Sequence, residues 1–447
     1  MKLSHTVFLV LTVALLLLPS SAGQASPTPS STQPQATSSG APTATVQSRK
    51  VTAYTLPPDL YRKARNLSKI RFRLGMIGFV YGLLVLWLIL HWKLSPKYRD
   101  WAEGFSGRRF LQSIVFAPPL LLTIAVLGLP VDIYSEWVEK QYGISVQSWG
   151  SWSWDWVKGQ FISLVVGTIL IWLLYIVIRR TPRRWWFYFW LISVPIGVFL
   201  FFIGPWVIDP MFHKFEPLQQ KDPELTASLE QMVQRAGENI PPQRMFWMGA
   251  GEKTTDLNAY VTGFGASKRI VVWDTTIAKM NTPQIVFAAG HETGHYVLQH
   301  IPKLLILFAV LLLIFYYFGY RTIGWVLARW GGGWTVRGLD DWASLPALLF
   351  LLSVFSFVAT PVASTISRHY EHQADQYGLE VTHGLTPDSG QVAAQAFQVL
   401  GEVGLSDPDP NPVQVFLFYD HPSIPDRIRF CLTYDPWAGG GHGEFVK

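Results

Sequence analysis

His291-Glu292-Thr293-Gly294-His295 is the stretch around which the chain is organised, and it lies within the longer run 283–300. Residues four positions apart project from the same face of a helix, so both imidazoles can bind one metal ion. Glu292 would then lie beside the metal, where its carboxylate can accept a proton from a water molecule that zinc acidifies. The pattern predicts a helix that carries a zinc site and a general base.

The residues before the motif predict the same helix independently. Thr282 is expected to be its N-cap, and Pro283 suits the first helical position. Apolar side chains then recur as in a helix that packs against a core, at Ile285, Val286, Ala289 and Val297. The motif therefore falls on the element that its chemistry requires.

The composition is that of a membrane protein. Of the 447 residues, 49% are hydrophobic and only 15% are charged. This charged fraction is too low for a soluble chain of this length. The net charge of +6 is concentrated at the ends of apolar runs, which fits a lipid bilayer as partner and gives no nucleic-acid-binding patch. The single cysteine, Cys431, excludes an internal disulfide and a cysteine-ligated zinc, and is expected to be a small core residue.

The first residues have the pattern of a secretory signal peptide. Within 1–23, Lys2 precedes an apolar run, and small residues follow Pro19. An uncleaved signal anchor is the alternative, although the apolar run is short for a full span. Residues 24–50 are rich in Ser, Thr, Pro and Gln, so they cannot bury a core and are expected to form a disordered tether.

Six longer apolar segments follow, each near the length that crosses a bilayer as a helix. Trp and Tyr crowd their ends, which is typical of an aromatic belt at the membrane interface. The segments are 74–92, 110–130, 161–178, 186–208, 303–320 and 344–366. We therefore expect a mainly α, multi-pass transmembrane bundle or barrel. Its N-terminal membrane domain, 51–208, would hold four spans, and a zinc metalloprotease domain, 209–447, would include the last two.

The loops between these segments differ in charge. Basic residues gather at 93–109 and 179–184, whereas the intervening loop at 131–158 carries four acidic residues. By the positive-inside rule the basic loops are cytoplasmic, so the soluble parts of the C-terminal domain should be extracytoplasmic. Six basic residues at 62–73 would then be external, against the rule. Together with the signal segment, the pattern predicts a bacterial inner-membrane protein whose active site faces the extracytoplasmic side.

A soluble insert separates the fourth and fifth spans. Residues 222–236 have helical periodicity with acidic residues in the first turn. Short strands are expected at 244–248, 258–263 and 269–273, with a hairpin turn between the last two. The zinc helix follows directly, so the insert is predicted to be a small α+β unit with a strand edge beside the metal.

A zinc site needs a third protein ligand, and the end of the last span offers candidates. If 367–375 continues as helix, Glu371 and Asp375 share one face. Glu371 can then ligate zinc, while Asp375 accepts the N–H of a ligand histidine and fixes its tautomer. His369 and His372 are rival ligands on other faces of this helix. The alternative is that the charged residues of 367–375 bind no metal and form a solvated cluster at the membrane surface.

Other interpretations of the motif remain open. An elongated zinc motif would need histidine where Ile301 stands, and His300 is one residue out of register. A site-two-type intramembrane protease would take its third ligand from a later span, where only Asp340-Asp341 stands in an apparent loop. In a transporter or a structural membrane protein, the motif would be accidental.

Several motifs in one order resemble the integral-membrane zinc metalloendopeptidases that include the type I CAAX prenyl proteases, with bacterial heat-shock membrane proteases as more distant relatives. The similarity runs from about Val51 to Arg429. Its motifs are Asn258-Ala259-Tyr260, Gly263-Phe264-Gly265, Lys268 to Val272 with Asp274-Thr275, His291 to His295, Ser367-Arg368 through Glu371 and Asp375, and His421-Pro422 with Arg427.

The resemblance implies a role for each matching residue. His291, His295 and Glu371 would bind one Zn²⁺ per chain, with Glu292 as the general base and Asp375 as the carboxylate that supports a ligand. As implied for this family, the zinc would lie in a large water-filled chamber enclosed by the membrane helices.

The resemblance also implies three residues that act on the substrate. His421 and Arg427 would help to hold the oxyanion of the tetrahedral intermediate, where a cationic or N–H donor contributes most. Asn258 would lie near the strand that aligns the substrate. The expected activity is hydrolysis of peptide bonds in membrane-associated or exported polypeptides. Turnover of damaged or mislocalised polypeptides is expected rather than CAAX processing, because a bacterium supplies no obvious prenylated substrate.

The chain departs from the family at three points. Thr293 stands where the family more often has leucine, an exchange that a packing residue tolerates. The family's first span corresponds here to the signal-like segment. The active site of the eukaryotic members faces the cytoplasm, whereas the arginine-rich loops here predict the opposite side.

Overall fold

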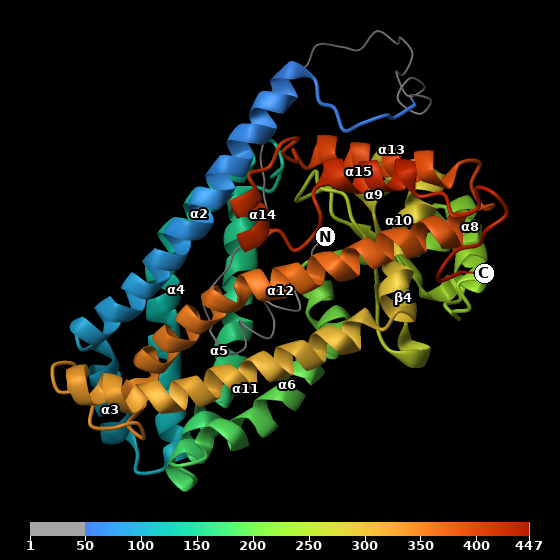
Figure 1. Ribbon diagram of the computed structural model, residues 1–447. Coiled ribbons are helices and arrows are strands. Elements are labelled where there is room, and N and C mark those ends of the chain that lie inside the picture. Colours follow the sequence, from blue (N-terminus) through green and yellow to red (C-terminus); the bar gives the residue numbers. More distant parts are fainter. Residues whose placement is uncertain (1–49, 447) are drawn as a thin grey trace.

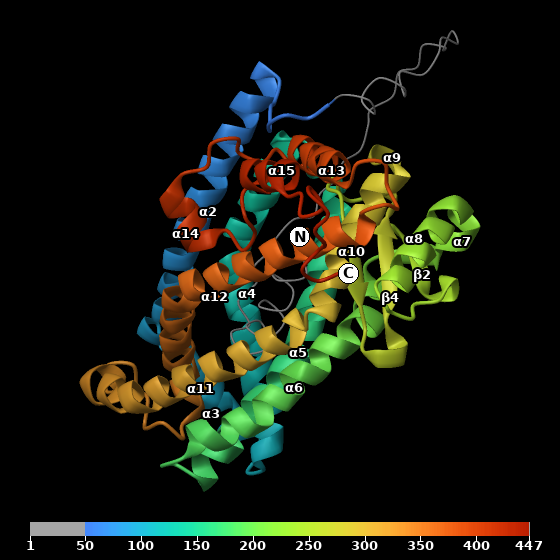
Figure 2. The same cartoon turned by 45° about the vertical axis from the view of Figure 1, so that its right-hand side comes forward.

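The structure is a computed structural model that describes residues 50–446 (Figures 1 and 2). The predicted signal segment at 1–23 lies outside the described residues, as does the predicted tether at 24–50 apart from Lys50. The description that follows concerns the remainder of the chain.

Within the described residues, six helices are long and apolar enough to cross a membrane, judged by length and composition. Each coincides with one predicted apolar segment, and most extend beyond it because polar residues continue the helix. They are α2 (Pro58–His91), α4 (Arg109–Gln141), α5 (Trp149–Arg180), α6 (Trp185–Val207), α11 (His300–Val326), which the π-helical turn η4 (Leu327–Gly331) extends, and α12 (Leu345–Thr382), which follows the 3-10 turn η5 (Trp342–Ser344).

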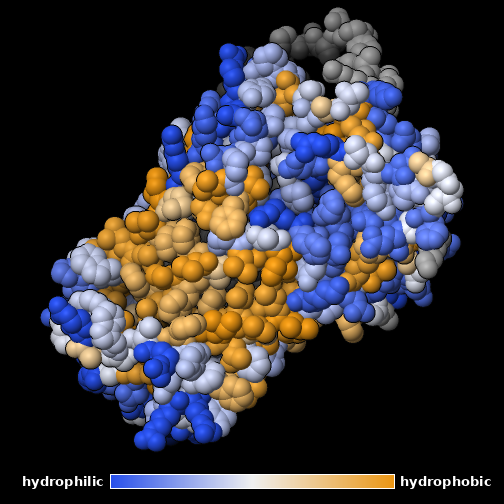
Figure 3. All heavy atoms as spheres, in the orientation of Figure 1, coloured by the Kyte–Doolittle hydropathy of each residue, from blue (hydrophilic) through white to orange (hydrophobic). Residues whose placement is uncertain are grey.

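Helix α2 marks one boundary of the apolar layer. Its exposed residues change from cationic at Lys69 and Arg73 to apolar at Ile77 and Val80. From this change to His91 the helix is about 27 Å long at 1.5 Å per residue, close to the ~30 Å of a bilayer's hydrocarbon core. Figure 3 shows the same division, with apolar residues over the long helices and hydrophilic residues over the soluble elements.

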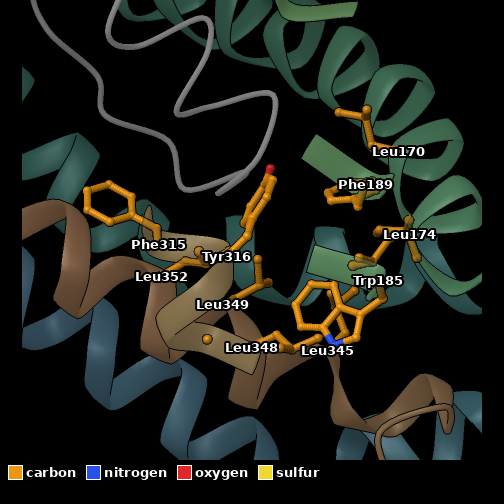
Figure 4. Close-up of a pocket in the computed structure, with 12 residues that line it drawn as sticks. Leu170, Leu174, Trp185, Phe189, Phe315, Tyr316, Leu345, Leu348, Leu349 and Leu352 are labelled. Carbon is orange, nitrogen blue, oxygen red and sulfur yellow. The ribbon is translucent and has the colours of Figure 1, made fainter. Parts of the chain in front are cut away.

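The long helices share one hydrophobic core. Its buried residues include Phe116, Tyr175 and Trp342, and the Tyr175 hydroxyl lies 2.8 Å from Ser344 Oγ. An apolar pocket of about 40 Å³ remains between α5, α6, α11 and α12, with Tyr316 on its lining (Figure 4). Because that lining is hydrophobic, the pocket is a packing feature without groups for chemistry.

An ion pair and a hydrogen bond from arginine side chains close the end of the bundle that carries α3 (Leu94–Phe105). Arg99 on α3 lies 2.7 Å from Asp341, with both side chains buried. Arg179 at the end of α5 donates to the carbonyl of Asp340 at 2.9 Å. The basic loops predicted from sequence therefore lie at this end, opposite the sheet and helix α10 (Figure 1).

A four-stranded sheet forms the centre of the soluble part, with the order β1-β2-β4-β3. The three predicted strands are confirmed, as β2 (Met245–Gly249), β3 (Ala259–Thr262) and β4 (Arg269–Trp273). Strand β1 (Lys214–Pro217) has only four residues, with Phe215 as its one large apolar side chain, and was not predicted. β4 pairs parallel with β2 and antiparallel with β3 through the predicted hairpin, which leaves β3 at the sheet edge.

Short helices cover the sheet and complete the chain. The helix predicted at 222–236 is confirmed as α8, and buried Cys431 lies in the second hydrophobic core, as predicted. The helices are α7 (Leu218–Lys221), α8 (Pro223–Arg235), α9 (Asp274–Lys279), α10 (Thr282–Val297), α13 (Ser389–Val403), α14 (Pro412–Phe418) and α15 (Ile424–Thr433), and the 3-10 turns are η1 (Asp209–Met211), η2 (Pro242–Arg244) and η3 (Gly265–Ser267).

Candidate metal centre

Helix α10 carries the histidine motif, as predicted, but its N-cap differs. Asn281, not Thr282, is the cap: its side chain accepts from the backbone N–H of Gln284 at 3.0 Å, and Gln284 Oε1 accepts from the Asn281 N–H at 3.1 Å. Asn caps better than Thr, and this reciprocal pair satisfies two backbone donors at once. The correction moves the start by one residue and leaves the two histidines on one face.

Glycines allow α12 to pack directly on α10. A Cβ added at Gly290 would lie 2.8 Å from Val381 Cγ1, and one added at Gly378 would lie 3.1 Å from the backbone nitrogen of His291. Within the motif, a Cβ added at Gly294 would lie 3.0 Å from the Cβ of Tyr377. This close approach brings the end of the last span against the histidine motif.

Three donors converge between the two helices. His291 Nε2 lies 3.3 Å from His295 Nε2 and 3.3 Å from Glu371 Oε2, and His295 Nε2 lies 3.6 Å from Glu371 Oε1. Tetrahedral ligands at about 2.0–2.2 Å from zinc are themselves about 3.3–3.6 Å apart. Glu371 Oε2 is buried and accepts no hydrogen bond from any described residue, so the donor set fits a metal ion.

Asp375 supports the first of these histidines from behind. Its Oδ1 lies 2.9 Å from His291 Nδ1, whereas the other donors lie near Nε2 of the same ring, and its Oδ2 accepts from Arg427 Nε at 2.9 Å. Burial by itself lowers the pKa of His291, but the carboxylates of Asp375 and Glu371 outweigh burial and raise it to about 9. Arg427, on α15, thus neutralises the buried carboxylate that orients His291.

His421 reaches the donors from the loop before α15. Its Nε2 lies 3.1 Å from Glu371 Oε1, and its Nδ1 lies 2.8 Å from Asp420 Oδ1. Burial lowers the pKa of His421, but the carboxylates of Glu371 and Asp420 outweigh burial and raise it to about 9. These two carboxylates therefore favour the protonated form of His421 beside the grouped donors.

Glu292 and Asn258 line a cavity beside the donors. This cavity, of about 60 Å³, is shared with His291, His421 and Arg427. The Asn258 backbone N–H donates to Thr276 Oγ1 at 2.8 Å, which fixes the start of edge strand β3. A second cavity of about 410 Å³, between α2 and the C-terminal segment, shares Asn258 and His421 with the first. The site therefore opens into a space large enough for a peptide segment.

The remaining sequence candidates lie elsewhere. His369 and His372 are exposed on other faces of α12 and are not among the grouped donors. Asp341 is paired with Arg99 at the opposite end of the bundle. It therefore does not join the two histidines as the third ligand that a site-two-type protease would need. The sequence analysis set His300 aside as a zinc ligand because it is one residue out of register, and it missed the contact of His300 Nδ1 with His295 Nδ1 at 3.1 Å.

Two histidines with a glutamate, next to a further carboxylate, form a donor set that zinc-dependent peptidases use. Here it stands at the end of a bundle of span-length helices. The fold and site therefore define the class of integral-membrane metallopeptidases. The model "CAAX prenyl protease N-terminal, five membrane helices" matches residues 44–214, and "Peptidase family M48" matches residues 219–434. The chain belongs to peptidase family M48.

Individual relatives agree with this assignment. The chain is 37% identical over 375 residues to an uncharacterized metalloprotease, YhfN, of Bacillus subtilis, covering 84% of this chain and 86% of the relative. It is 27% identical to CAAX prenyl protease 1 of Saccharomyces cerevisiae, over 87% and 90% of the two chains. The crystal structure of S. mikatae Ste24p matches with a TM-score of 0.70 at 22% identity, covering 87% and 92%.

These findings decide the predictions of the fold class and the enzyme class. The fold class, a mainly α multi-pass membrane bundle with a small α+β protease domain, is confirmed, and the protein is a metalloendopeptidase. A polypeptide substrate and the lipid bilayer are its partners. The two alternatives, a site-two-type protease and a transporter or structural protein, are wrong.

Proposed function

We propose that the metal is zinc, one ion per chain, held by His291, His295 and Glu371. The observation that carries this proposal is the spacing of the three donors, 3.3, 3.3 and 3.6 Å apart, around a buried carboxylate oxygen that accepts no hydrogen bond from the part of the chain that the structure describes. When bound, zinc would supply an acidified water and a polarised scissile carbonyl. Asp375 would fix His291 with Nε2 facing the metal.

In the proposed mechanism the chain's own residues move the protons. Glu292, at the cavity beside His291, would accept the proton of the attacking water and pass it to the leaving amine. His421 and Arg427 would stabilise the negative charge that develops on the substrate oxygen. Asn258 would help to align the substrate along edge strand β3, whose outer edge can add an extended peptide.

We infer that the substrates are membrane-associated or exported polypeptides and that the active site is extracytoplasmic, in a bacterial inner membrane. The basic loops gather at the end of the bundle opposite the metal centre (Figure 1), which supports a cytoplasmic position for that end. We also propose a membrane domain, 51–208, and a protease domain, 209–447; the boundary between the two family-model matches, 44–214 and 219–434, supports a division near this position.

Zinc content and cleavage of labelled casein by the purified protein test the mechanism. About one zinc per chain is expected, lost in Glu371→Ala. Glu292→Gln should keep its zinc and lose at least about 10²-fold in cleavage rate. His372→Ala, on an exposed face of the same helix, is the matched control and should change neither. Cleavage retained in Glu292→Gln would contradict the assignment of the base.

The side of the membrane is tested separately with reporters fused after Lys447. Alkaline phosphatase should be active there and a cytoplasmic fluorescent protein should not be. The reverse pattern would place the site in the cytoplasm and overturn the proposed class of exported substrates.

A further inference from the structure

His300 lies directly behind the second histidine of the motif. It is the first residue of α11, its exposed fraction is 0%, and α10 ends only three residues earlier at Val297. The turn is this short because Gln299 adopts a left-handed conformation, with φ of 56°, which is uncommon for a residue other than glycine. The backbone therefore accepts a strained conformation that brings His300 against His295.

A chain of hydrogen bonds runs from the metal centre through His300. His300 Nδ1 lies 3.1 Å from His295 Nδ1, and His300 Nε2 lies 3.1 Å from Gln373 Oε1. The ring of His300 stacks on Tyr370, with centroids 4.6 Å apart and an interplanar angle of 15°. Three helices thus meet at this imidazole: α11 carries it, α10 supplies His295, and α12 supplies Gln373 and Tyr370.

The partners determine where each proton lies. Gln373 Oε1 can only accept, so His300 carries its proton on Nε2 and its Nδ1 is an acceptor. His295 must then donate from Nδ1, which leaves His295 Nε2 as a lone pair. That atom faces His291 Nε2 and Glu371. The network therefore selects the tautomer of His295 that can bind a metal at the convergence point.

We propose that His300 and Gln373 are positioning residues that hold His295 in its metal-binding tautomer and orientation. This inference rests on the proposed zinc site and adds the support for its second histidine. The two ligand histidines then differ, because His291 donates to a carboxylate at Asp375 and His295 donates to a neutral chain. A carboxylate partner makes an imidazole a stronger donor to a metal than a neutral partner does.

Zinc affinity, measured by competition with a chelating indicator, tests this role without using activity. His300→Leu removes the acceptor for His295 and should weaken zinc binding roughly 10- to 100-fold. His300→Asn keeps an acceptor oxygen near the position of Nδ1 and should stay within a few-fold of the parent protein. His369→Leu, an exposed histidine on α12, is the control and should leave zinc affinity unchanged.

Gln373 gives a second test that does not alter a fully buried residue. Gln373→Leu should weaken zinc binding in the same direction as His300→Leu. Gln373→Glu, which replaces the neutral acceptor by a carboxylate, should bind zinc at least as tightly as the parent. Thermal unfolding in EDTA shows that each variant is folded, and if His300→Leu does not fold, the Gln373 pair decides the question.

The outcomes separate this inference from the zinc site itself. If the parent protein binds zinc and loses it in Glu371→Ala, yet His300→Leu and Gln373→Leu bind zinc as the parent does, His300 only fills space and the inference is wrong. Equal losses in His300→Asn and His300→Leu would also refute it. A parent protein that binds no zinc would instead overturn the proposed function.

Discussion

Gly290→Ala tests whether the close contact of α10 with α12 holds the metal donors together. The new Cβ would lie 2.8 Å from Val381 Cγ1, whereas carbon atoms in contact prefer about 3.5–4.0 Å. Val381 is completely buried, and a β-branched side chain in a helix has little freedom at χ1. One helix must therefore shift by several tenths of an ångström.

The expected magnitude follows from this overlap. Overpacking of a core costs about 1–3 kcal/mol, and the higher helix propensity of alanine offsets up to about 1 kcal/mol of it. A net loss of roughly 0.5–2 kcal/mol in the free energy of unfolding is expected. Because α12 carries Glu371, its displacement should also weaken zinc binding, by about tenfold for each 1.4 kcal/mol of strain in the bound state.

Thermal unfolding in detergent and zinc competition provide the assay. Gly319→Ala in α11, where an added Cβ meets nothing within 4 Å, is the control and should be neutral or slightly stabilising. Val381→Ala in the Gly290→Ala background restores the space, so the two substitutions should couple by about 1 kcal/mol or more. Additive effects with unchanged zinc affinity would show that this contact does not position the donors.

Two further predictions concern the support of the donors. Asp375→Asn keeps the size of the side chain but removes its charge, and zinc affinity should fall roughly 10- to 100-fold; unchanged affinity would mean that the carboxylate is dispensable. Burial lowers the pKa of His291, but Asp375 and Glu371 outweigh burial and raise it to about 9. Protonated His291 therefore stabilises the metal-free protein fully below about pH 6.5, and this stabilisation is lost as the pH rises through 9. Zinc must displace that proton, so the increase in melting temperature caused by buffered zinc should grow from pH 6.5 to 9; an increase that is constant with pH contradicts this assignment.

Local patterns in the sequence determined the elements. The spacing of His291 and His295 predicted the metal helix, and the lengths of six apolar runs predicted the six span-length helices. Both signals depend on the fixed rise and periodicity of a helix, which hold wherever the segment lies. Strand β1 was not predicted because it has only four residues, none of them β-branched, and ends in proline. The cap at Asn281 was missed because neighbouring Thr282 is also a cap-forming residue.

Tertiary structure decided which side chains meet. Glu371 follows the motif by 76 positions in sequence, and only the packing of α12 on α10, through glycines such as Gly290 and Gly378, brings its carboxylate to the histidines. The bond from Arg427 to Asp375 and the contact of His300 with His295 likewise join different helices. Helix periodicity gives the face on which a residue lies, but the partner of that face depends on long-range packing, which no local pattern encodes.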